Sequence, residues 1–112
     1  MTEELKQKII EECARRQLNN PTVTYIPEYN QITYEIGNSA CGGMDCPDYL
    51  HSKDALTPLI EGLSDEELIN YDIAINQIIK EAHFDLALQV DIHKATAEQM
   101  AEALYFGAWK LE

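Results

Sequence analysis

The sequence predicts an α+β fold, a small antiparallel β-sheet packed against two or three α-helices with an added N-terminal helix. Apolar residues recur at helical spacing near both ends of the chain, whereas residues 22–36 hold two β-branched and aromatic runs separated by a short turn. At 112 residues the chain has the size of a single domain, which we divide into an N-terminal helix (1–20) and an α+β core (22–110).

The N-terminal helix is expected to begin after Thr2, which can cap it, and the acids Glu3 and Glu4 suit the positive end of its dipole. The Asn-Asn-Pro run at 19–21 should end the helix. Its apolar residues form one stripe for the core: Leu5, Ile9, Ile10, Cys13, Ala14 and Leu18.

A hairpin and a loop are predicted next. Residues 22–26 and 31–36 have the composition of strands, and the four residues 27–30 between them suit a hairpin loop. Residues 37–48 contain three of the five glycines of the chain and show no periodicity. They are therefore predicted to be the longest irregular stretch.

Two helices are expected in the middle of the chain. Ser52 can cap a short helix that Gly62 closes, in which Pro58 must introduce a kink or a restart. Ser64 and Glu67 then form a capping box, which predicts a longer helix.

Residues 84–92 fit two structures. Their apolar residues alternate strictly, as in a strand with one buried face, but they also continue the helical spacing of the preceding segment. After them, Thr96 and Gln99 form a second capping box, which predicts a helix that ends near Gly107. We expect the sheet to pack against the helices that begin at Ser64 and Thr96, with the first helix at the edge.

The charge of the chain argues against nucleic acid and membranes as direct partners. The formal net charge is −12, and residues 41–112 carry fourteen acidic against four basic side chains. Both arginines, Arg15 and Arg16, belong to the first helix, so no basic stripe is available for a phosphate backbone. No apolar run approaches the roughly 20 residues that span a bilayer. Three cysteines, an odd number, suit a reducing compartment, and we expect a cytoplasmic protein.

No catalytic signature occurs in the sequence, and we expect neither an enzyme nor a cofactor. Cys41, Cys46 and His51 form a Cys-x4-Cys-x4-His array of zinc-ligand types, but this spacing is not a usual zinc pattern. Loop cysteines in a reducing cytosol are the simpler interpretation, so no metal is assigned. His83 and His93, with acids close by, would share a solvated face if their segment is a strand.

Two motifs resemble small phage proteins of the ABA-sandwich type. One is the run His-Lys-Ala-Thr-Ala-Glu-Gln-Met-Ala-Glu-Ala-Leu at 93–104, followed by Gly107 and Trp109. The other is Pro-Asp-Tyr at 47–49 with Ser-Lys-Asp-Ala at 52–55. The family includes the first type of Thoeris anti-defence proteins, which sequester cyclic ADP-ribose signals, and in some members cyclic oligonucleotides, without hydrolysing them. The resemblance implies an oligomer with ligand pockets between protomers.

The resemblance also implies candidate ligand-binding residues. Those that match the motifs are Tyr49, Ser52, Asp54, Thr96 and Gln99, and the nearby cations Lys53 and Lys94 could meet a phosphate. Two positions depart from the family pattern: Ser52 replaces an Asp, and Met100 replaces an Arg. Thr96 and Gln99 are equally well explained by a capping box.

Two functions are consistent with these observations. The first is a phage anti-defence protein, a homo-oligomer in the host cytoplasm that captures an immune signalling nucleotide without catalysis. The alternative is an acidic protein-interaction inhibitor that blocks a basic, nucleic-acid-binding surface of a host defence protein. Trp109, the sole tryptophan, suits either a core position or an interface anchor.

Overall fold

The structure, a computed structural model, describes residues 2–37, 40–82 and 95–111. The described elements, in chain order, are α1 (Glu3–Leu18), β1 (Thr24–Ile26), β2 (Gln31–Ile36), β3 (Ala40–Asp45), α2 (Lys53–Glu61), α3 (Asp65–Ala82), α4 (Ala97–Ala103) and the π-helical turn η3 (Leu104–Ala108). This is an α+β fold with an N-terminal helix, as predicted. None of the described helices is both long and apolar enough to cross a bilayer.

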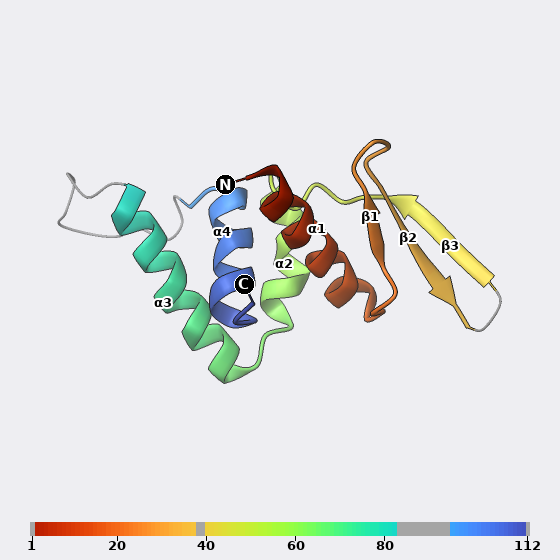
Figure 1. The fold of residues 1–112 in the computed structure, drawn as a ribbon. Helices are drawn as coiled ribbons and strands as arrows, with labels where there is room; N and C mark the ends of the chain where they lie inside the picture. The colour runs from red at the N-terminus through yellow and green to blue at the C-terminus, as the bar shows by residue number, and fades with distance from the viewer. Residues whose placement is uncertain (1, 38–39, 83–94, 112) are drawn as a thin grey trace.

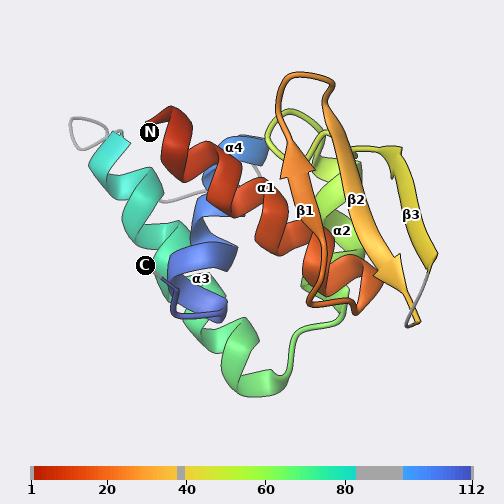
Figure 2. The same ribbon diagram turned by 45° about the vertical axis from the view of Figure 1, so that its right-hand side comes forward.

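The helices and the sheet occupy different ends of the molecule. Figures 1 and 2 both show α3 at one end and the sheet at the other, with α1, α2 and α4 between them. The predicted packing of the sheet on the helices after Ser64 and Thr96 is therefore wrong, because α1 is the helix that contacts β1. Ile9, Cys13 and Ala14 are fully buried, since α1 also packs against α2 and α4.

The sheet is antiparallel in the order β1-β2-β3, and its two faces differ. Tyr25 pairs with Ile32, and Ile32 pairs with Met44, so these three side chains share one face with Tyr34 and Ile36. Ile32 is 1% exposed, whereas Ile36 is 55% exposed. The helices therefore cover only the part of the apolar face around Ile32.

Strand β3 lies within residues 37–48, which were predicted to be a loop. Gly42 pairs with Tyr34, and a Cβ atom on residue 42 would lie 2.6 Å from the Tyr34 ring. The glycine thus allows the ring to lie across the strand. The pairing depends on this contact and on backbone hydrogen bonds, so the composition of the segment did not indicate it.

The predicted capping boxes are present. The Glu67 N–H donates to Ser64 Oγ (3.2 Å), and the Ser64 N–H donates to Glu67 Oε1 (3.0 Å). At α4, the Gln99 N–H donates to Thr96 Oγ1 (3.1 Å), and the Thr96 N–H donates to Gln99 Oε1 (2.9 Å). These reciprocal bonds fix the starts of α3 and α4.

The other predicted helix ends agree with the structure in part. The Leu5 N–H donates to Thr2 Oγ1 (3.1 Å), as predicted for the start of α1. Ser52 is the N-cap residue of α2, but its side chain makes no capping hydrogen bond. Pro58 lies inside α2, and the helix continues to Glu61.

Several predictions fall outside the described residues. These are the choice between strand and helix for residues 84–92, the positions of His83 and His93, and the candidate ligand-binding residue Lys94.

Candidate functional site

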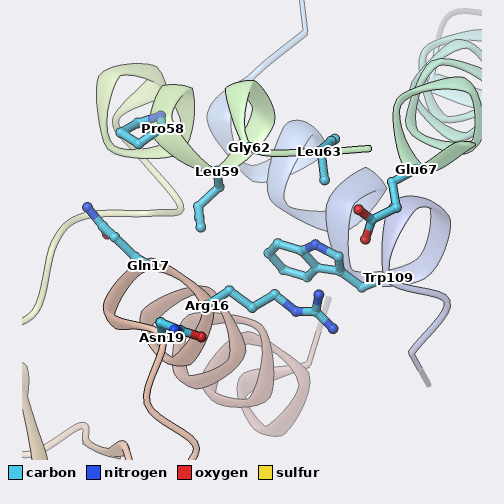
Figure 3. A pocket seen from close by; sticks show the side chains of 9 residues that line it. All are labelled: Arg16, Gln17, Asn19, Pro58, Leu59, Gly62, Leu63, Glu67 and Trp109. Atoms are coloured by element: carbon cyan, nitrogen blue, oxygen red, sulfur yellow. The ribbon is translucent and has the colours of Figure 1, made fainter. Parts of the chain in front are cut away.

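A pocket of about 340 Å³ lies between the C-terminal ends of α1 and α2, the turn from α2 to α3, and the C-terminal Trp109 (Figure 3). Pro58, Leu59 and Leu63 supply much of its apolar surface. Its polar side chains are Arg16, Gln17, Asn19 and Glu67. The pocket therefore combines an aromatic ring, aliphatic walls and charges of both signs.

The end of α1 supplies three of the polar residues. Asn19 adopts the left-handed conformation (φ 50°), and its N–H donates to the carbonyl groups of Arg15 and Arg16. An asparagine tolerates this conformation better than most residues, so α1 ends here. The helix end thereby presents Arg16, Gln17 and Asn19 to the pocket.

Trp109 is positioned by the π-helical turn. Its N–H donates to the Leu104 carbonyl (2.9 Å), which closes the turn directly before the C-terminal segment. Gly107, within this turn, packs against Asn70 and Ala74 of α3. Trp109 is only 9% exposed, so the ring is a fixed wall of the pocket.

Arg16 stacks on Trp109. The guanidinium carbon lies 4.5 Å from the centre of the indole ring, a cation–π contact. Arg16 Nε donates to Glu12 Oε1 (2.9 Å), which holds the guanidinium in place. Within the described part of the chain, the two terminal nitrogens of Arg16 have no hydrogen-bond partner.

Glu67 brings a negative charge to the pocket. The Ser64 backbone N–H that it accepts lowers the pKa of its carboxyl, and the charge of Arg16 adds a smaller effect in the same direction. No ion pair joins Arg16 to Glu67 among the described contacts, although both line the pocket. A ligand can therefore lie between the two charges.

Tyr49, one of the sequence-predicted residues, contacts the pocket lining. Its side chain is 1% exposed, and its hydroxyl donates to Gln17 Oε1. Burial raises the pKa of Tyr49, so the hydroxyl remains protonated and can donate. Tyr49 thus orients Gln17, which lines the pocket.

The other described candidates lie away from the pocket. Ser52, Lys53 and Asp54 are at the N-terminal end of α2, whereas the pocket is at its C-terminal end. Thr96 and Gln99 begin α4 and use polar groups in their capping box. None of these five residues lines the described pocket.

Sequence reasoning did not assign Arg16, Glu67 and Trp109 to a common site. Arg16 was noted as a charge of the first helix, Glu67 as part of a capping box, and Trp109 as a core or interface residue. Each of these roles can be assigned from the residue and its neighbours in the sequence. The contact between Arg16 and Trp109 joins opposite ends of the chain, and no spacing pattern could indicate it.

The cysteine and histidine array is not gathered into a metal site. Cys41 is exposed, whereas Cys46 is buried and donates to the Pro47 carbonyl (3.3 Å). His51 Nδ1 lies 2.8 Å from Asp48 Oδ1. Across the described ranges, no group of three or more His, Cys, Asp or Glu side chains is arranged to hold a metal ion.

Known proteins give no further assignment. Comparison with protein-family models, with curated proteins and with solved structures finds no match to this chain. The resemblance to phage ABA-sandwich proteins therefore rests on the motifs at 47–49, 52–55 and 93–104.

Proposed function

We propose that the protein binds a small nucleotide in the pocket beside Trp109 and sequesters it without chemical change. The observation that carries this proposal is the Arg16 guanidinium held on the Trp109 ring at 4.5 Å. It places a fixed positive charge with available N–H donors beside an aromatic and aliphatic wall. A phosphate and a planar base require this combination.

The size of the pocket fits one nucleotide unit. Its volume of about 340 Å³ is at the lower end of the range of roughly 300–1,000 Å³ that is typical of small-molecule sites. A cyclic ADP-ribose or a cyclic oligonucleotide would extend beyond it. We therefore also propose a homo-oligomer, in which a second protomer covers the remainder of the ligand.

The resemblance to the Thoeris anti-defence family suggests the biological role. In this proposal the protein is a phage product that captures a host immune signalling nucleotide in the cytoplasm and so lowers its free concentration. The polar side chains of the pocket are one guanidinium, two amides and one carboxylate, a set suited to holding a ligand by hydrogen bonds.

The fluorescence of Trp109 provides a direct test, because it is the sole tryptophan of the chain. We expect a saturable change with one member of a panel of cyclic ADP-ribose isomers and cyclic di- and trinucleotides, and recovery of the intact ligand after denaturation. Arg16→Gln should weaken binding about tenfold or more, since a charge-assisted hydrogen bond is lost.

Lys8→Gln is the matched control, because it removes the same charge from an exposed position of α1 that forms only a surface ion pair with Glu4. It should leave binding unchanged. A panel without any fluorescence change at millimolar ligand, or equal losses in the two variants, would contradict the proposed site.

The distribution of ion pairs favours the acidic inhibitor as a second candidate. The four basic residues of α1 pair with acids of α1 itself: Lys6, Lys8, Arg15 and Arg16. The excess of acids in residues 41–112 is thus not offset by these bases. Such an inhibitor should lose affinity for its partner steeply as salt rises, whereas nucleotide binding in the pocket should change much less.

A further inference from the structure

The pocket presents hydrogen-bond donors on its α1 side and hydrogen-bond acceptors on its α3 side. The terminal nitrogens of Arg16 are donors, and the Trp109 indole N–H is a donor for which the described residues provide no partner. In Figure 3 the Arg16 guanidinium lies on one side of the Trp109 ring, and the indole nitrogen lies on the ring edge that faces Leu63. The guanidinium suits the oxygen atoms of a phosphate.

Glu67 provides acceptors on the other side. Its Oε1 accepts the Ser64 N–H at 3.0 Å, and the Ser64 side chain also interacts with the carboxylate and helps to lower its pKa. Figure 3 shows the carboxylate turned toward the Trp109 ring, across the hollow from Leu59. A ligand that carried only negative charge would be repelled here, so the group that meets Glu67 must donate hydrogen bonds.

We propose that the nucleotide carries a guanine base, an inference that rests on the proposed function. The Watson–Crick edge of the base donates to the Glu67 carboxylate, and the phosphate of the nucleotide binds Arg16. Guanine presents two adjacent donors on this edge, the ring N1–H and the exocyclic amino group, which match the two oxygens of a carboxylate. Adenine presents an acceptor, N1, beside its amino group, and hypoxanthine presents the N1–H alone.

Two features of the site support this pairing. Glu67 is ionised at neutral pH like an ordinary glutamate, and the Ser64 N–H lowers the pKa of its carboxyl further. Leu59 and Leu63 line the pocket, with Leu63 between Leu59 and Glu67 in Figure 3, and both can contact a base. A guanine-containing cyclic oligonucleotide is accordingly a better ligand than a signal that contains adenine alone.

The test compares 5′-GMP, 5′-IMP and 5′-AMP by titration of Trp109 fluorescence. We expect 5′-GMP to bind about tenfold more tightly than either 5′-IMP or 5′-AMP, since guanine donates two hydrogen bonds to the carboxylate whereas hypoxanthine and adenine each donate one. Glu67→Gln should abolish this preference. The variant keeps the capping box, because a glutamine oxygen can still accept the Ser64 N–H.

Glu66→Gln is the control, since it removes the same charge at an exposed neighbour whose ion pair with Lys110 is long (4.0 Å). It should retain the preference for 5′-GMP. Equal affinities for the three nucleotides, or a preference that survives Glu67→Gln, would overturn the guanine assignment and leave the nucleotide site in place. If none of the three nucleotides binds, the site itself is wrong as well.

Discussion

Gly107 of η3 packs directly against Ala74 of α3, so closely that a Cβ atom on residue 107 would lie 2.5 Å from the Ala74 Cβ. The same atom would lie 2.9 Å from the Asn70 carbonyl oxygen. Glycine therefore permits the contact between the π-helical turn and α3. Because Trp109 follows this turn, the contact also positions the wall of the candidate site.

We expect Gly107→Ala to destabilise the protein by about 1–3 kcal/mol through overpacking against α3, measured by urea unfolding. Gly43→Ala is the control, since its Cβ would come no closer than 3.5 Å to the Ile32 carbonyl oxygen. The double variant with Ala74→Gly should regain part of the loss. Equal stabilities of the two single variants would show that the approach of η3 to α3 is looser than the structure indicates.

Tyr49→Phe should lower the free energy of unfolding by about 1 kcal/mol, because it removes the partly buried hydrogen bond from the Tyr49 hydroxyl to Gln17 Oε1. The control is Tyr29→Phe, because the Tyr29 side chain is 75% exposed. We expect no change in the free energy of unfolding for this variant. If Tyr49 also orients Gln17 in the pocket, nucleotide affinity should fall in the first variant alone. An unchanged stability of Tyr49→Phe would argue against a contribution of this hydrogen bond.

The cysteines should differ in reactivity toward iodoacetamide. Cys41 is exposed and should be alkylated in the native protein. Burial raises the pKa of Cys46 to about 11 and also raises the pKa of Cys13, so both remain thiols at neutral pH. Mass spectrometry should find one modification in the native state and three in urea. Rapid native labelling of Cys13 would contradict its complete burial.

Local signals predicted much of the fold. The capping boxes at Ser64 and Thr96 each depend on side chains three residues apart, and the helices begin where these pairs indicate. The strand at 31–36 was also predicted, because its β-branched and aromatic residues are adjacent in the sequence. Such features are encoded within a few residues and can be inferred without tertiary contacts.

Strand β3 and the pocket could not be predicted in this way. The place of Gly42 in a strand depends on the Tyr34 ring that lies over it. Likewise, the site depends on Arg16 meeting Trp109, and each residue alone has an ordinary structural explanation. The position of α1 between the sheet and α4 brings these distant residues together, and it follows from packing of the whole chain.

A substitution at Thr96 distinguishes two candidate binding sites, the residues that the family resemblance implies and the pocket beside Trp109. Thr96→Ala removes the acceptor for the Gln99 N–H and should cost about 1 kcal/mol of stability, as is typical for the loss of an N-cap. If the ligand binds beside Trp109, affinity should remain unchanged at temperatures where the variant is folded. A large loss of affinity in Thr96→Ala, with binding retained in Arg16→Gln, would instead favour the residues that the family resemblance implies.

Glu67 should make stability depend on pH in a defined direction. Its pKa in the folded state is lowered, chiefly by the Ser64 N–H, relative to an ordinary glutamate value of about 4.3. Between the two values the unfolded chain binds more protons than the folded one, so the stabilisation is complete above the unfolded value. It is lost as pH falls through the folded value.

We therefore expect the melting temperature of the wild type to exceed that of Glu67→Gln at pH 7, and the difference to shrink below pH 4. Because the side chain is near the surface, the difference should be small and should decrease with added salt. Glu66→Gln, which removes an equal charge outside the capping box, shows how much of the effect comes from net charge alone. A difference that persists unchanged at pH 2.5, where the carboxyl is protonated in both states, would mean that the glutamine perturbs the capping box and that ionisation of Glu67 contributes nothing.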